Sequence, residues 1–164
     1  MKIGILILMA LSAFAQEGVT VNLKSLFEGY KRNMMGSVIK FKPADMDFKP
    51  SPDVRTVREM IGHVADANYS ICSQMKGETN PDKGGNAKKD DLIPALSTSF
   101  DYCLAAIDAV DGKMAEKTNA RVPRDKGYAA LHLLDHTALH YGNIITYMRI
   151  KGLVPLESEP KPKP

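Results

Sequence analysis

Apolar residues recur every three to four positions in four separate stretches, and no stretch shows the two-residue alternation of a strand. The stretches are 21–41, 57–76, about 92–107 and about 128–150, and the segments between them are polar and contain proline or glycine. Four amphipathic helices of this length bury their apolar faces most economically against one another. The pattern therefore predicts an all-α protein with a four-helix bundle.

The connection over residues 78–89 is polar, rich in glycine and longer than a usual turn between helices. A connection of this length allows the second and third helices to run parallel instead of forming a tight hairpin. Thr56 and Glu59 form the pattern of a capping box, which predicts the start of the second helix, and Gly77 predicts its end.

The first fifteen residues have the pattern of a secretory signal peptide. Lys2 precedes a short apolar stretch, and Ala13-Phe14-Ala15 fits a cleavage site; a buried N-terminal helix is the alternative. We therefore expect a signal peptide over 1–15, a bundle over 16–155 and a disordered tail over 156–164. The mature protein would be exported, either periplasmic or secreted, with no stable membrane insertion because no apolar run reaches about 20 residues.

The charge balance argues against nucleic acid as a partner. Twenty-two Lys and Arg against nineteen Asp and Glu leave a formal charge of only +3 in 164 residues, and no dense basic helix is present. We therefore expect a small-molecule substrate and no nucleic acid. Met and Leu outside the histidine stripe of the fourth helix make a homodimer a candidate state.

All four histidines lie on expected helices, and three of them, His132, His136 and His140, are spaced by four. Neighbours in this stripe are about 6 Å apart along the helix axis, whereas the outer two are about 12 Å apart. One adjacent pair can thus share a metal ion, and His63 is the only other histidine available as a third ligand. Three imidazoles would leave a coordination position open for water or substrate, as in catalytic sites. The alternative is a structural bundle with an incidental stripe.

Two segments, DVRTVREMIGHVADANYSIC from Asp53 and LHLLDHTALHYGNIITYMRIKGLVP from Leu131, resemble the DinB/YfiT-like family of metal-dependent enzymes. The resemblance matches His63, His136 and His140 to the family's metal ligands. It also matches the trailing motif at Tyr147, Met148, Arg149, Gly152 and Pro155. It implies an up-down-down-up four-helix bundle with a divalent metal, often nickel or zinc, held by three histidines. Manganese is a further candidate for the ion. The family's Arg-Gly-Gln after the last ligand is Tyr141-Gly142-Asn143 here.

Four further residues are candidates for supporting the site. Glu59 and Asp66 lie within side-chain reach of His63 along the second helix and could accept the second N–H of an imidazole or act as a base. His132 is a candidate for the edge of the pocket, and Tyr141 for its lining. The alternatives are solvated carboxylates and ordinary core packing.

Cys72 and Cys103 fall on the second and third helices. If these helices are parallel neighbours in an oxidising compartment, the two cysteines are a candidate disulfide. The alternative is a pair of small buried hydrophobic residues.

Together these features favour an exported metal-dependent enzyme that carries out hydrolysis or group transfer on a small substrate. Family activities include transfer to cytosolic thiols, which export would disfavour. The alternative is a non-catalytic periplasmic bundle that binds a metal or a small ligand.

Overall fold

The computed structural model describes the backbone of residues 2–160 and the side chains of residues 20–160. It contains four α-helices, α1 (Lys2–Val38), α2 (Val57–Lys76), α3 (Leu92–Ala109) and α4 (Lys126–Ile150). Three single 3-10 turns accompany them: η1 (Pro43–Asp45), η2 (Asn86–Lys88) and η3 (Leu156–Ser158). Within the described residues the only β pairing is an isolated bridge between Lys117 and Asp125. The expected all-α fold is confirmed.

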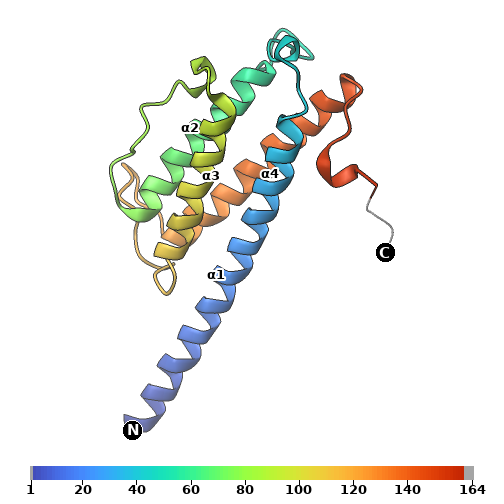
Figure 1. Cartoon of the computed structure of the whole chain (residues 1–164). Helices are drawn as coiled ribbons and strands as arrows, with labels where there is room; N and C mark the ends of the chain where they lie inside the picture. The colour runs from blue at the N-terminus through green and yellow to red at the C-terminus, as the bar shows by residue number, and fades with distance from the viewer. Residues whose placement is uncertain (1, 161–164) are drawn as a thin grey trace.

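Figure 1 shows the up-down-down-up arrangement of the bundle, in which α2 and α3 run parallel and α1 and α4 run the opposite way. Helices α1 and α2 each pack against both α3 and α4, so α1 and α2 occupy opposite corners. The parallel pair follows from the long connection between α2 and α3, as the sequence predicted.

Local sequence signals determine where α2 and α4 begin. Thr56 and Glu59 form the expected capping box, in which the Glu59 amide donates to Thr56 Oγ1 and the Thr56 amide donates to Glu59 Oε2. Asp125 caps α4 by accepting a hydrogen bond from the Tyr128 amide, so this helix begins two residues before its apolar pattern. Gly77 ends α2 in the left-handed conformation, with φ of 74°.

The core runs the length of the bundle and is largely aliphatic, with Phe27 and Phe100 in contact at a centroid distance of 5.2 Å. Its largest fully buried side chains come from all four helices: Phe27, Phe100, Met34, Ile61, Met75, Leu96, Ile107, Leu133, Ile144, Met148, Val38 and Val57.

Cys72 of α2 and Cys103 of α3 are joined by a disulfide, with Cα atoms 5.3 Å apart. Both side chains are completely buried in the core. The parallel neighbours thus place the two cysteines at the same height, which is the arrangement that the sequence analysis required for a bond.

The N-terminal end of the chain is helical. Helix α1 continues back to Lys2, and Figure 1 shows its N-terminal part extending beyond the other helices. The side chains of the expected signal peptide lie outside the described residues, so this assignment stays a prediction. None of the described helices is long and apolar enough to span a bilayer.

The first residues of the tail for which disorder is expected form turn η3 and contact α1. Turn η3 docks on α1, where the Leu156 amide donates to Ser37 Oγ at 3.1 Å and the Leu156 side chain lies over Gly36. Lys40 also forms an ion pair with Glu159. One apolar side chain and these polar contacts therefore order a segment of otherwise polar composition, while residues 161–164 lie outside the described part.

The bundle depends on a close approach between α2 and the connection that follows it. A Cβ atom built on Gly62 would lie only 2.3 Å from the backbone nitrogen of Ala87. We expect Gly62→Ala to lower the free energy of unfolding by about 2 kcal/mol, because η2 would have to move. Gly142→Ala is the matched control, since a Cβ there meets nothing within 4 Å and gains up to ~1 kcal/mol of helix propensity. Urea unfolding measures the free energy of unfolding of each variant. Equal changes in the two variants would contradict the close approach at Gly62.

Candidate metal centre

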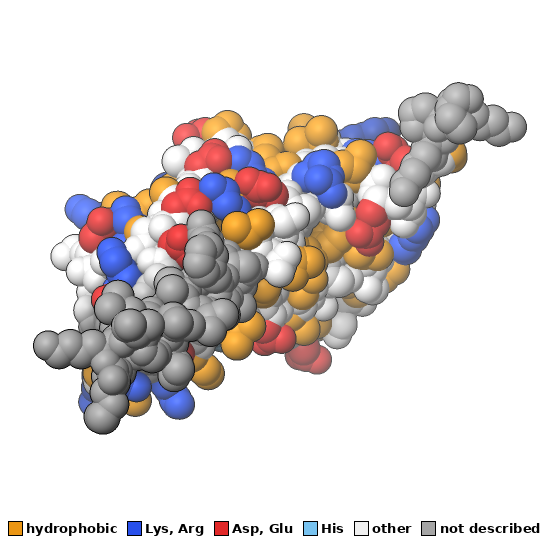
Figure 2. Space-filling model, turned by 90° about the horizontal axis from the view of Figure 1, so that it is seen from below, with side chains coloured by type: hydrophobic (Ala, Val, Ile, Leu, Met, Phe, Trp, Pro, Cys, Tyr) orange, Lys and Arg blue, Asp and Glu red, His pale blue; other side chains and the backbone are white. Residues whose placement is uncertain are grey.

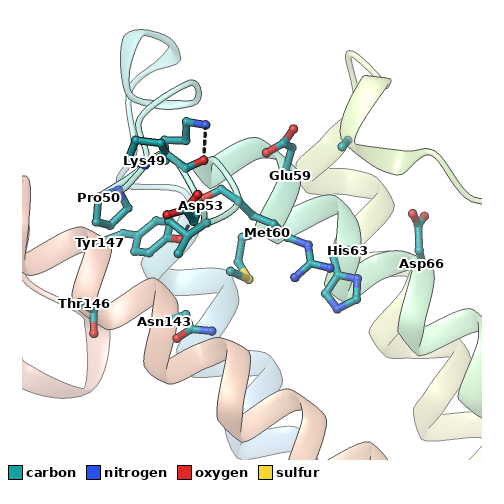
Figure 3. Close-up of a pocket in the computed structure, with 14 residues that line it drawn as sticks. Lys49, Pro50, Asp53, Glu59, Met60, His63, Asp66, Asn143, Thr146 and Tyr147 are labelled. Atoms are coloured by element: carbon teal, nitrogen blue, oxygen red, sulfur yellow. Dashed lines mark hydrogen bonds between the residues drawn. The ribbon is translucent and has the colours of Figure 1, made fainter.

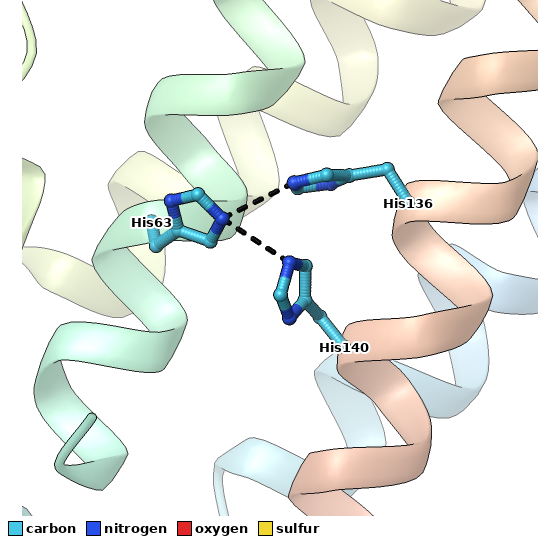
Figure 4. Close-up of side chains that lie close together, drawn as sticks. All are labelled: His63, His136 and His140. Atoms are coloured by element: carbon cyan, nitrogen blue, oxygen red, sulfur yellow. Dashed lines mark hydrogen bonds between the residues drawn. The ribbon is translucent and has the colours of Figure 1, made fainter. Parts of the chain in front are cut away.

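Three imidazoles converge in the space between α2 and α4 (Figure 4). The Nε2 atom of His63, from α2, lies 3.1 Å from Nε2 of His140 and 3.2 Å from Nε2 of His136, both from α4. His140 is only 7% exposed, and the other two are half-buried. The i, i+4 spacing puts the α4 pair on one face, and the α2–α4 packing supplies the third ring.

Hydrogen bonding alone does not satisfy this cluster. A neutral imidazole carries one N–H, so a single proton on His63 Nε2 cannot be donated to His136 and His140 together. A zinc ion bound tetrahedrally at about 2.0–2.1 Å would hold ligand nitrogens about 3.3–3.4 Å apart. The two separations from His63, 3.1 and 3.2 Å, are close to that spacing, and all three ligand atoms lie within 4.8 Å of one another. The three-histidine cluster could therefore bind one metal ion.

The second nitrogens of the rings have different environments. His140 Nδ1 lies 3.4 Å from Nδ2 of Asn143. When Nε2 of His140 binds a metal, its Nδ1 carries the N–H, and the Asn143 amide turned by 180° would accept this hydrogen bond through its oxygen. His136 Nδ1 is buried and has no hydrogen-bond partner. Asn143 is thus the residue that orients His140, although in the sequence it stands out only as a departure from the family motif.

The two expected supporting carboxylates are engaged elsewhere. Glu59 accepts from the Thr56 amide at 2.8 Å as part of the helix cap. Asp66 accepts from the amides of Gly85 and Asn86 and thereby anchors the connection between α2 and α3. Their hydrogen bonds are structural, and neither is bonded to an imidazole.

The two other candidates lie outside the cluster. Tyr141 is 4% exposed and faces α1, where its hydroxyl lies 3.5 Å from Ser37 Oγ. His132 is exposed one turn before His136, with ring centroids 6.1 Å apart. His132 lines a separate cavity of about 230 Å³ that Arg124 also borders.

A cavity of about 1040 Å³ opens beside His63 (Figure 3). One wall comes from the segment before α2 and the first turns of α2, and the other from the C-terminal half of α4. The lining residues are Lys49, Pro50, Pro52, Asp53, Val54, Arg55, Glu59, Met60, His63, Asp66, Ala87, Asn143, Thr146 and Tyr147. Arg55 has no local sequence signal, because its approach to the histidines depends on how the preceding loop folds.

A contact between distant parts of the chain fixes that loop. The Tyr147 hydroxyl donates to the Arg55 carbonyl at 2.8 Å, and the Tyr147 ring meets Phe48 edge to face at 6.2 Å. Tyr147 is 5% exposed and belongs to α4. The helix that supplies two of the histidines thus also positions the segment that forms the cavity wall.

The environment keeps the imidazoles neutral, which is the form that binds metal. Burial lowers the pKa of His136 and of His140 to about 4 each, with neighbouring imidazoles and the Arg55 charge acting in the same direction. The pKa of His63 is also lowered, first by burial and then by Arg55, while Asp66 opposes the shift.

The fold and the cluster together define an all-α protein whose four-helix bundle holds three imidazoles suited to one metal ion. A family model described as the DinB superfamily matches residues 28–144, and the chain belongs to this superfamily. The crystal structure of a DinB-like protein of Bacillus subtilis, YjoA, has a similar fold, with a TM-score of 0.72. That match covers 85% of this chain and 99% of YjoA at 15% identity, so it shows the fold alone. Among proteins with curated descriptions, none matched.

The lowered pKa values predict a loss of stability on acidification. An unfolded imidazole takes up its proton near pH 6.5, whereas His136 and His140 do so only near pH 4. Between these values the unfolded state binds more protons, so the free energy of unfolding falls as the pH drops from about 6.5 to about 4 and then levels off. Urea unfolding of the metal-free protein across this range tests the effect. In the double variant His136→Asn/His140→Asn, the free energy of unfolding should fall less over this pH range. If the variant shows the same pH dependence as the wild type, the effect does not come from these two histidines.

Proposed function

We propose that this protein is an exported metal-dependent enzyme that carries out hydrolysis or group transfer on a small molecule. The observation that carries the proposal is the meeting of three Nε2 atoms beside a cavity of about 1040 Å³. A cavity of this size admits a small molecule. The three-ligand set leaves room for that molecule at the metal.

The residues of the chain have distinct parts in this proposal. His63, His136 and His140 would hold a divalent ion, for which zinc, nickel and manganese are candidates, and imidazole suits zinc and nickel in particular. Such an ion supplies Lewis-acid chemistry, which polarises a substrate group or activates a nucleophile. Asn143 orients His140 through its Nδ1. Tyr147 positions the wall against which the substrate would lie.

A small substrate also fits the surface charge. On the face shown in Figure 2, basic and acidic side chains are interspersed among hydrophobic ones and are not gathered by sign. A nucleic-acid-binding surface would concentrate basic residues. On the outer side of α4, Leu131 and Leu139 are 66% and 60% exposed, which supports a homodimer as the proposed assembly.

One observation favours the second candidate, a non-catalytic binding protein. Glu59 and Asp66, the carboxylates closest along the chain to His63, are committed to a helix cap and a loop anchor. A reaction would therefore have to proceed without them as a base. Turnover that requires metal distinguishes an enzyme from a binding protein.

We expect the mature chain, purified without a His tag, to contain about one zinc, nickel or manganese ion per chain by elemental analysis. His63→Ala, His136→Ala and His140→Ala should each lose most of it, because two remaining imidazoles bind a metal far more weakly. His132→Ala is the matched control, since it removes an exposed histidine of the same helix outside the cluster. Metal retained in all four variants, or absent from the wild type after titration, would refute the site.

Export makes a separate prediction. Expressed with its own N-terminus in a Gram-negative host, the protein should be found in the periplasm or medium with Gln16 as its first residue. Cys72 and Cys103 should then resist alkylation until a reductant is added, because they are buried and bonded. N-terminal sequencing and thiol labelling measure both features. An intact Met1 and cytoplasmic recovery would contradict export without affecting the metal site.

A further inference from the structure

We infer that the cavity beside His63 is a subsite for a carboxylate of the substrate and that Arg55 is the residue that recognises it. This inference rests on the proposed function, since it specifies the class of molecule that the metal centre would act on. The substrate would be a small carboxylic acid anion whose reacting group lies near its carboxylate.

The guanidinium group of Arg55 is available to bind a ligand, because it forms none of the ion pairs that stabilise the described part of the fold. It stands one residue before the N-cap of α2, is exposed and lines the cavity together with His63. None of the ion pairs found in the described part of the chain involves its guanidinium group. Its backbone is held from the other wall, where Tyr147 donates to its carbonyl. The loop is thus fixed while the charged end stays available.

Three other charged groups of the cavity, Lys49, Glu59 and Asp66, are engaged by the fold. Lys49 donates to the Pro52 carbonyl at 2.9 Å within its own loop. Glu59 is held in the capping box and Asp66 in the anchor of the α2–α3 connection. Arg55 lines the same cavity as His63, whose Nε2 lies 3.1 Å from His140 Nε2 and 3.2 Å from His136 Nε2. A ligand held by Arg55 would therefore lie beside the metal centre.

The composition of the wall favours a carboxylate over a phosphate. A guanidinium presents two parallel N–H groups that match either a carboxylate or a phosphate in a bidentate pair, so the neighbouring charges decide between them. Asp53, Glu59 and Asp66 also line the cavity, and three negative charges repel a dianion more strongly than a monoanion. A single uncommitted arginine among three carboxylates is suited to one negative charge.

Acetate is the probe for a carboxylate. Inorganic phosphate, titrated at equal ionic strength, is the anion with which it is compared. Both are titrated into isotope-labelled full mature protein, with and without zinc, while NMR follows the arginine Nε–Hε and backbone amide signals. We expect acetate to shift the Arg55 signals and to bind the zinc-loaded protein more tightly than phosphate does. Arg55→Gln should weaken acetate binding about tenfold, the scale of a charged hydrogen-bonded pair at an exposed site. Arg55→Lys should weaken acetate binding by an intermediate amount, because lysine keeps the positive charge but lacks the two parallel N–H groups of the guanidinium.

Arg124→Gln is the matched control, because Arg124 is also exposed, lies in the loop before α4 and borders the other cavity. Unchanged acetate binding in this variant, with a loss in Arg55→Gln, supports the inference. Equal binding in wild type and Arg55→Gln would assign acetate to zinc alone and overturn it. Phosphate that binds as tightly as acetate would overturn the carboxylate assignment.

The test separates failure of the subsite from failure of the metal centre. If the wild type takes up no zinc, the proposed function is refuted. The titration of the metal-free protein then shows whether Arg55 binds the anion without a metal. Acetate shifts at Arg55 in that form support an anion site without a metal. The absence of such shifts in both forms overturns the inference even when zinc is bound.

Discussion

Helix α2 packs against α4 because the connection between α2 and α3 crosses from one end of the bundle to the other. Short turns would make consecutive helices antiparallel neighbours and would place α2 and α4 at opposite corners. The connection instead makes α2 and α3 parallel, so that α2 packs on both α3 and α4. Asp66 holds this connection through the amides of Gly85 and Asn86, and Gly62 allows it to lie close. The meeting of His63 with the α4 histidines depends on this anchored crossover.

Signals that act within one helix were predictable from the sequence. Of the contacts across the bundle, only the Cys72–Cys103 pair and the meeting of His63 with the α4 histidines were anticipated. The Thr56 cap and the four-residue spacing of His136 and His140 are local, so both the helix start and the shared face followed from them. A carboxylate near His63 in sequence is different, because Asp66 bonds to a loop about twenty positions away. Arg55 is placed by a hydrogen bond that spans 92 positions, which no local pattern encodes.

The cluster imposes an energetic cost that the rest of the bundle must offset. Three imidazoles lose hydration in a small volume, and His136 Nδ1 is buried without a partner. An unsatisfied buried polar atom costs roughly 1–3 kcal/mol. The Cys72–Cys103 bond limits the unfolded chain and can contribute about 3–4 kcal/mol by the chain-entropy model. The parallel helices that bring His63 to α4 thus also permit the bond that offsets the cost of the site.

The placement of Arg55 beside metal ligands has two opposed effects. Its charge helps to keep the imidazoles neutral, which favours metal binding in mild acid, but it also repels the cation that they would hold. The carboxylates of Asp53, Glu59 and Asp66 on the same wall reduce that repulsion. With a divalent ion bound, the ion together with Lys49 and Arg55 would exceed these three carboxylates by a single positive charge. A ligand with one negative charge would neutralise that excess, which makes the electrostatic balance of the whole wall, and not Arg55 alone, the reason to expect a monoanion.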